Sequence, residues 1–572
     1  MSPQLPPVAP AVTAALVAAL SPRLRKRLDS GIAKLADRPV ARDGEIVRIA
    51  VDDDTGLELH APDGAVRGTD DVRCGCLLAP DCLHRAAAAS LAPVAEAAGS
   101  PARPDEPAPA EDTALAPETA TPEQRAAARA VRLAASAVLE AGTDGAGAVL
   151  QAELLRAAHS ARLAGLHRAA AGAVSVVTAL RAARAADPAY HLTDLAAGLY
   201  DVLLVAHRLP STSGGDLTAL RGTARRPYRP DGSLRLYGLF SEPVLTASGY
   251  AGAVTWTADA EGRLYQVSDV APGGAGRAVG AADRAVRIGD TALTHRELAR
   301  AGLAVSGATV SPTGRLGAGA GVRAVRAPGA DWHTDPVTRL WAEPVPDQLT
   351  RALSGGHDLL FLDITVTGTA TEAAGDCLLA DCAGMPLRLT AAYDDPALPH
   401  RDNLRLLSAA RGTRLRVVAR LTPAPHPRAQ LLATEHPARP DTRLDIGLDR
   451  LQGADLPAAT ASSGSAPVPV PDFDEAPIHL LRRRVHQSVS GGRAVLALPG
   501  DTRADAGRLR RCGLATAAEL LTDLRSAAAD RAHDVFGRLR PADPDRFARA
   551  WLAAAHYTAE LDRALCLAAW TS

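Results

Sequence analysis

Three of the seven cysteines in this chain of 572 residues fall within nine residues, and a histidine follows the last of them after one intervening residue. These four residues, Cys74, Cys76, Cys82 and His84, have the spacing Cys-x-Cys, then five residues, then Cys-x-His. Three thiolates and one imidazole make up a complete tetrahedral ligand set for Zn²⁺, which accepts sulfur and nitrogen donors. Because four protein ligands leave no coordination position for a substrate, the pattern predicts one structural zinc ion.

The local sequence can bring these four side chains together. Residues two apart in an extended strand project to one face, so the first two cysteines can share a metal. Asp81 is a good helix N-cap, and the alanine-rich run 85–91 is a strong helix former. The third cysteine and the histidine would then lie at the start of a helix, where the helix dipole favours the thiolate that zinc binds.

Two other interpretations of this cluster stay open. The cysteines can be ordinary buried thiols, with His84 on a helix surface. They can also form a redox pair, although Cys-x-Cys differs from the Cys-x-x-Cys of redox motifs and leaves the histidine unexplained. In a chain so poor in cysteine, however, four ligand-type residues at these gaps favour the metal site.

The motif and its surroundings resemble the SWIM zinc finger, in which Cys-x-Cys…Cys-x-His is preceded by short β-strands and followed by a helix. The alternating segments 45–51 and 57–60 fit the strands, and Asp63-Gly64 marks a turn. The resemblance covers residues 40–98. It implies a ββα fold with the three cysteines and the histidine as zinc ligands, and a role described for the family as DNA-binding or protein-binding.

The charge of this segment bears on the choice between those two roles. Between 41 and 98 there are five arginines and eleven acidic residues, a net charge of −6 before any metal is bound. A surface that binds phosphates needs the opposite sign. The segment therefore favours a protein partner, unless another part of the chain supplies positive charge.

The overall composition excludes several further classes of protein. Sixty-three basic residues balance 64 acidic ones, which excludes a globally basic DNA-coating protein. The two lysines, Lys26 and Lys34, fit neither a Walker A loop nor a Ser-x-x-Lys motif, and the chain lacks His-Glu-x-x-His and Gly-x-Ser-x-Gly. No nucleophile–base pair or open metal site stands out, so the sequence favours a binding protein without excluding an enzyme.

Shifts in composition along the chain indicate several domains, and we expect a multidomain α+β protein. We expect N-terminal helices in 1–38, the zinc module in 40–98, a linker at 99–121, a helical segment at 122–208, a mixed β/α region at 233–350, an OB-like β-barrel at 357–436, a second linker at 440–476 and a helical C-terminal domain at 477–572. Thr121 and Gln124 form a capping box that marks the start of the helical segment.

The order of elements between 357 and 436 is that of an OB-fold barrel, with three strands, a helix and two more strands. The strands are expected at 359–369, 377–380, 386–390, 414–421 and 429–434, and the helix at 402–410. Such a barrel would be poorly equipped to bind single strands, because it has eight arginines against nine acids and two aromatic residues. Cys377 and Cys382 lie in it and are expected to be ordinary thiols.

The C-terminal helices carry the most positive charge. Between 477 and 572 there are fifteen arginines and ten acidic residues, with arginine clusters at 482–484 and at 508, 510 and 511. If the protein binds nucleic acid, these helices are the best-charged candidate for the phosphate contact, with the zinc module or the OB-like barrel reading shape or single strands.

These observations predict a zinc-binding, non-catalytic adaptor that contacts a protein partner in a larger assembly, with nucleic-acid binding as the alternative. No window reaches the roughly 18 uninterrupted apolar residues of a membrane-spanning helix. The apolar stretch 12–20 precedes its basic cluster, which is the reverse of a secretory signal. We therefore expect a cytoplasmic protein that does not bind membranes.

Overall fold

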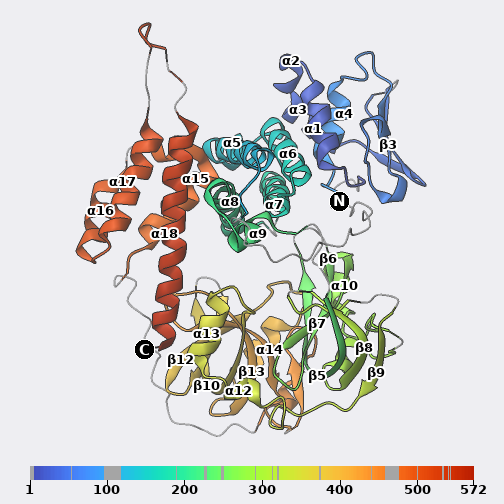
Figure 1. The fold of residues 1–572 in the computed structure, drawn as a ribbon, viewed down its shortest axis with the longest axis vertical. Coiled ribbons are helices and arrows are strands. Elements are labelled where there is room, and N and C mark those ends of the chain that lie inside the picture. Colours follow the sequence, from blue (N-terminus) through green and yellow to red (C-terminus); the bar gives the residue numbers. More distant parts are fainter. Residues whose placement is uncertain are drawn as a thin grey trace. The chain divides into compact units, whose positions relative to one another are not determined.

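The chain forms two compact units in the computed structural model (Figure 1). The first unit comprises Met1–Arg225 and Phe473–Thr558, and the second comprises Arg226–Asp472 and Ala559–Ser572. The structure describes residues 5–52, 55–95, 118–187, 190–223, 229–246, 250–289, 291–311, 313–317, 321–372, 375–439, 441–457, 476–498, 500–530, 534–538, 540 and 543–571. Most of the expected linker 99–121, and part of the second linker, lie outside these residues.

The N-terminal part of the first unit is a small module of helices and strands. Its helices are α1 (Pro10–Ala19), α2 (Pro22–Arg25), α3 (Leu28–Ala36) and α4 (Leu83–Leu91), with the short 3-10 turns η1 (Pro62–Gly64) and η2 (Thr69–Asp71). Its strands are β1 (Val40–Asp43), β2 (Ile46–Ala50), β3 (Gly56–His60) and β4 (Val72–Cys74), which form one antiparallel sheet in chain order. The strands expected at 45–51 and 57–60, and the helix after the motif, are confirmed.

The core of this module follows from the period-two pattern of its central strands. Val47 and Ile49 of β2 lie opposite Leu59 and Leu57 of β3, and all four side chains are buried. They belong to one apolar cluster with α1 and with the alanines 86–89 of α4. The small alanine side chains of α4 pack against α1 and α3.

The rest of the first unit is helical. Its elements are α5 (Pro122–Gly145), α6 (Ala148–Leu163), α7 (His167–Arg184), α8 (Leu192–Arg208), η3 (Leu209–Ser211), α9 (Gly215–Arg221), α15 (His479–Ala497), α16 (Thr502–Arg511), α17 (Ala515–Ala529) and α18 (Pro544–Thr571), whose last residues belong to the second unit. The capping box expected at Thr121 and Gln124 is confirmed, since each side chain accepts a hydrogen bond from the other residue's backbone N–H.

Helices α5 and α15 meet at two glycines. Gly142 and Gly492 each interrupt their helix with a left-handed backbone, at φ of +69° and +66°. A Cβ atom on Gly142 would lie 2.3 Å from the backbone nitrogen of Gly492. The hydroxyl of Thr143 donates to the carbonyl of Ser490 at 2.7 Å, which closes the contact. Backbone therefore packs directly on backbone here, and a side chain would not fit.

The second unit contains two sheets. The five-stranded sheet has the order β7 (Leu264–Pro272), β6 (Tyr250–Ala258), β5 (Arg229–Leu245), β8 (Gly302–Val310) and β9 (Arg323–Ala327), with the helices α10 (Gly274–Val279) and α11 (His295–Leu298). The helices α12 (Arg339–Ala342) and α13 (Val345–Leu353) follow and contact β10 (Leu359–Glu372) of the other sheet. The six-stranded sheet has the order β12 (Met385–Ala391), β11 (Gly375–Cys382), β10 (Leu359–Glu372), β13 (Arg414–Leu421), β14 (Arg428–Glu435) and β15 (Arg443–Asp445), with α14 (His400–Leu407) and η4 (Gly453–Asp455).

One pairing in the six-stranded sheet joins strands that are distant in the strand order. Residues 388–391 of β12 pair in parallel with 428–431 of β14, so the strands from β10 to β14 are paired around a ring. The ring encloses an apolar cluster that includes Leu360, Leu389 and Leu431. The mixed α+β class expected from the sequence is confirmed.

Part of the segment expected to be the second linker, 440–476, is folded. Strand β15 pairs with the end of β14, and η4 follows it. Arg443 of β15 is buried and donates hydrogen bonds to the carbonyls of Gly238, Leu239 and Ala330, which ties the two sheets together. Composition does not indicate this strand, because the carbonyls that Arg443 binds are more than a hundred residues away in the sequence. Among the described helices, none is long and apolar enough to span a membrane.

We expect Gly142→Ala to destabilise the helical part of the first unit. The new Cβ would overlap the backbone of α15, and the overlap adds roughly 1–3 kcal/mol to a left-handed strain of about 1 kcal/mol. Gly44→Ala is the matched control, because Gly44 has φ of +59° but nothing within 4 Å of the added Cβ. Urea unfolding followed by circular dichroism should show the larger loss for Gly142→Ala. Equal losses would contradict the close crossing.

Candidate metal centre

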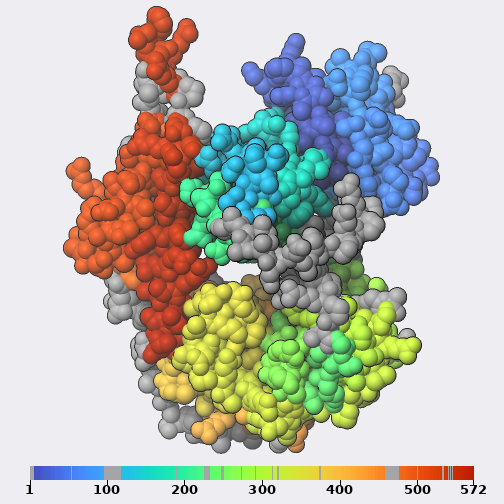
Figure 2. All heavy atoms as spheres, viewed as in Figure 1, coloured from blue at the N-terminus to red at the C-terminus, as the bar shows by residue number. Residues whose placement is uncertain are grey.

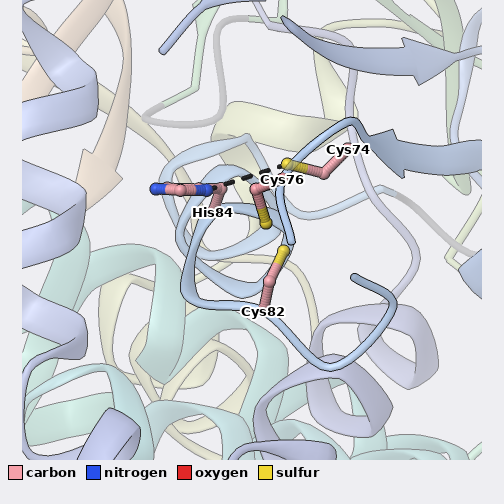
Figure 3. A group of neighbouring side chains, drawn as sticks. All are labelled: Cys74, Cys76, Cys82 and His84. Carbon is pink, nitrogen blue, oxygen red and sulfur yellow. Dashed lines mark hydrogen bonds between the residues drawn. The ribbon is translucent and has the colours of Figure 1, made fainter. Parts of the chain in front are cut away.

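All four residues predicted from the sequence converge at one place in the N-terminal module (Figure 3). Their three Sγ atoms and one imidazole nitrogen lie within 4.8 Å of one another, and Sγ of Cys74 is 3.7 Å from Nδ1 of His84. In a tetrahedral site with Zn–S bonds of about 2.3 Å, neighbouring sulfur ligands lie about 3.8 Å apart. The cluster could therefore hold one metal ion. No second group of three or more potential ligands converges within the described part of the chain.

The four side chains come from three consecutive pieces of chain. Cys74 is the last residue of β4 and pairs with Leu57 of β3. Because the strand ends there, Cys76 reaches the cluster from the following turn, and not from the shared strand face expected from its spacing. That turn is closed by a hydrogen bond from the N–H of Ala79 to the carbonyl of Cys76.

The helix that supplies the last two side chains starts one residue later than expected. Cys82, and not Asp81, is the N-cap of α4, and His84 lies in the first helical turn. The Cys82 side chain makes no capping hydrogen bond to the backbone of α4. The expected position of both residues at a helix start is confirmed.

The environment of the thiols is unfavourable for several free anions. Burial raises the pKa of Cys74 to about 12 and raises that of Cys82. Burial acts in the same direction on Cys76, but hydrogen bonds from the N–H of Leu78 and from the other thiols outweigh it and lower its pKa. A bound cation would remove the obstacle, because it stabilises all three thiolates together.

A buried arginine holds this part of the chain in shape, and it is not apparent from the motif. The guanidinium of Arg85 donates hydrogen bonds to the carbonyls of Thr69, Val72 and Pro80. These carbonyls belong to η2, to β4 and to the segment just before Cys82, so one side chain links the pieces that carry the ligands. The one available signal is that Arg85 is the only arginine in the otherwise small and apolar run that follows His84.

The turn between the second and third cysteines is unusually apolar. Leu77 and Leu78 occupy its two central positions, where glycine, proline, asparagine and aspartate are favoured. Leu77 is fully exposed and Leu78 is 62% exposed. Since the two leucines contribute little to the core of the module, the fold alone does not account for them.

The other cysteine pair noted in the sequence does not form part of a metal cluster among the described residues. Cys377 and Cys382 lie on β11 and are buried in the six-stranded sheet. Burial raises the pKa of both thiols, that of Cys382 to about 11. Both are therefore protonated at neutral pH.

Comparisons with protein-family models, with curated proteins and with solved structures gave no match for this chain. The geometry and the donor atoms of the cluster are therefore the evidence for what it can bind.

We expect Arg85→Met to weaken metal retention, because it leaves three carbonyls without their donor while keeping an apolar stem of similar length. Unsatisfied buried polar groups cost about 1–3 kcal/mol each, and part of this cost falls on the metal-bound form. Arg73→Met is the control, since Arg73 is exposed on β4. Competition with a chromogenic chelator should show weaker binding for Arg85→Met alone. Equal affinities would show that the arginine does not support the site.

Proposed function

We propose that the cluster binds one structural zinc ion and that residues 40–98 form a SWIM-type module. Three sulfur donors and one nitrogen donor match the preference of zinc. The order of short strands, ligands and helix supports the SWIM interpretation. Four protein ligands would saturate a tetrahedral ion, so the metal serves as a scaffold and not as a reagent. A site of reduced thiolates is suited to the cytoplasm, where we place the protein.

The function that we propose for the module is to present an apolar tip to a protein partner. The exposed pair Leu77 and Leu78 is the observation that carries this proposal. A metal bound by Cys76 and Cys82 would restrain the chain on both sides of the two leucines, and the carbonyl of Pro80 is held by Arg85. A turn restrained in this way loses little conformational entropy when it binds, which favours affinity.

The charge of the module indicates what kind of partner it suits. Asp63, Asp70 and Asp81 are exposed in the same module, whose net charge is −6. We propose a partner that offers an apolar pocket bordered by basic side chains, because opposite potentials at the rim steer association and give specificity. The protein would then act as a non-catalytic adaptor.

We further propose that the ring of strands from β10 to β14 is an OB-type barrel. The helix α14 lies between the third and fourth strands, and the closing pair β12–β14 is parallel. The strands of the ring contribute aliphatic side chains to its core, which Trp570 of α18 joins, and the aromatic residues Phe361 and Tyr393 are largely withdrawn from solvent. This composition suits a scaffold better than a single-strand binding surface.

The adaptor role is tested by affinity purification from nuclease-treated extract of the native cells, followed by binding measurements with the purified partner. We expect Leu77→Ser/Leu78→Ser to retain the metal and lose the partner, and Cys82→Ser to lose both. Leu163→Ser is the control, because Leu163 is 77% exposed at the end of helix α6, outside the zinc module. Removing two apolar contacts should weaken binding by roughly 10-fold or more. A partner that still binds the double-leucine variant with full affinity would contradict the proposed docking tip.

A further inference from the structure

A second turn with two exposed apolar residues lies near the C-terminal end of the first unit. Residues 534–538 have the sequence Asp-Val-Phe-Gly-Arg, and Val535 and Phe536 are 89% and 82% exposed. The other phenylalanines that the structure describes, Phe240, Phe361 and Phe547, are buried. Figure 2 shows residues 534–538 as a small group at the top of the view, away from the other coloured residues. Packing within the fold therefore does not explain why a phenyl ring is placed here.

The turn is held in one conformation by its first residue. The carboxylate of Asp534 accepts hydrogen bonds from the N–H groups of Phe536 and Arg538, at 2.9 and 2.8 Å. The N–H of Gly537 donates to the carbonyl of Asp534, and Gly537 adopts a left-handed φ of +77°. Val535 and Phe536 occupy the central positions of this turn. The ring is thus presented on a preorganised backbone, which reduces the entropy lost on binding.

Two exposed arginines follow the ring in the sequence. Arg538 and Arg540 are exposed, while the carboxylate of Asp534 is occupied by its own turn. Of the acidic residues that flank the turn, Asp530 and Asp545 are paired with Arg546 and Arg132, whereas Asp543 is exposed and accepts a hydrogen bond from the N–H of Asp545. The exposed ring is therefore accompanied by guanidinium groups.

We propose that this turn contacts single-stranded nucleic acid, with Phe536 stacking on an unpaired base and Arg538 and Arg540 binding the flanking phosphates. Proteins that bind single strands without sequence preference usually combine aromatic rings, which stack on bases, with cationic groups, which bind phosphates. The arginines that follow the ring distinguish this turn from the acidic module that carries Leu77 and Leu78. Two apolar side chains are too few to anchor a protein in a lipid surface, but one ring suffices to stack on one base.

Other helices of the same unit carry further exposed arginines, alongside exposed acidic residues such as Asp501 and Glu519. The exposed arginines are Arg483 of α15 and Arg510 and Arg511 of α16. Arg484, in contrast, forms an ion pair with Asp505. The exposed arginines can add sequence-independent phosphate contacts. The proposal goes beyond the adaptor role of the zinc module and does not depend on it, since it involves neither the metal nor the two leucines.

The test is the fluorescence anisotropy of labelled oligothymidylate of about 20 nucleotides, titrated with the full chain at about 50 mM salt. We expect Phe536→Ala to weaken binding roughly 5- to 100-fold, the usual effect of losing one stacked base, and Phe536→Trp to retain it. Arg538→Gln should flatten the salt dependence by about 0.7 in the slope of log K against log salt. Leu498→Ala is the control, because Leu498 is 64% exposed without an aromatic ring.

Three outcomes would overturn the proposal. The first is an absence of measurable binding by the wild-type chain at low salt. The second is equal affinity of the wild type and Phe536→Ala, with unchanged thermal unfolding showing that the variant is folded. The third is binding to anionic phospholipid vesicles that depends on Phe536 while binding to the oligonucleotide does not. Loss of partner binding in the double-leucine variant would leave these results unaffected, so the two proposals can fail separately.

Discussion

Three thiol groups cannot share so small a volume as anions unless a cation lies among them. This constraint governs the N-terminal module, because burial raises the pKa of Cys74 and Cys82 while the backbone holds both close to Cys76 and His84. A bound metal would stabilise the three thiolates. It would also cross-link the end of β4, the short turn that follows it and the first turn of α4. The four residues lie within eleven positions of the sequence, so such a cross-link would restrain mainly the local chain.

The module is in turn tied to the neighbouring helices of the first unit. Asp29 of α3 accepts a hydrogen bond from the N–H of Ala148, at the start of α6, and pairs with Arg184. A carboxylate at this position is favoured by the positive end of the helix dipole. Arg181 of α7 donates to the carbonyl of Ala92, directly after α4. Any change that loosens the ligand segment therefore reaches the helical part through α3 and α4.

The features predicted from the sequence are those determined by neighbouring residues. The spacing of the ligands, the capping box at Thr121 and the alternation of the strands in 45–60 are local signals, and the structure contains them. The features that were not predicted depend on distant residues. The carbonyls that Arg85 binds, the parallel pairing of β12 with β14, and the contact of Gly142 with Gly492 are set by tertiary packing, which a spacing pattern does not encode. The exposure of a side chain also depends on tertiary packing. Leu78 and Phe536 are apolar residues of the types usually found in a core, yet both are exposed.

The most direct test of the central claim is X-ray absorption at the zinc edge, on protein purified without added metal and combined with elemental analysis. The account predicts one zinc per chain, with about three sulfur neighbours at about 2.3 Å and one nitrogen neighbour at about 2.0 Å. A chain that contains no transition metal, or a zinc ion surrounded mainly by oxygen, would contradict it.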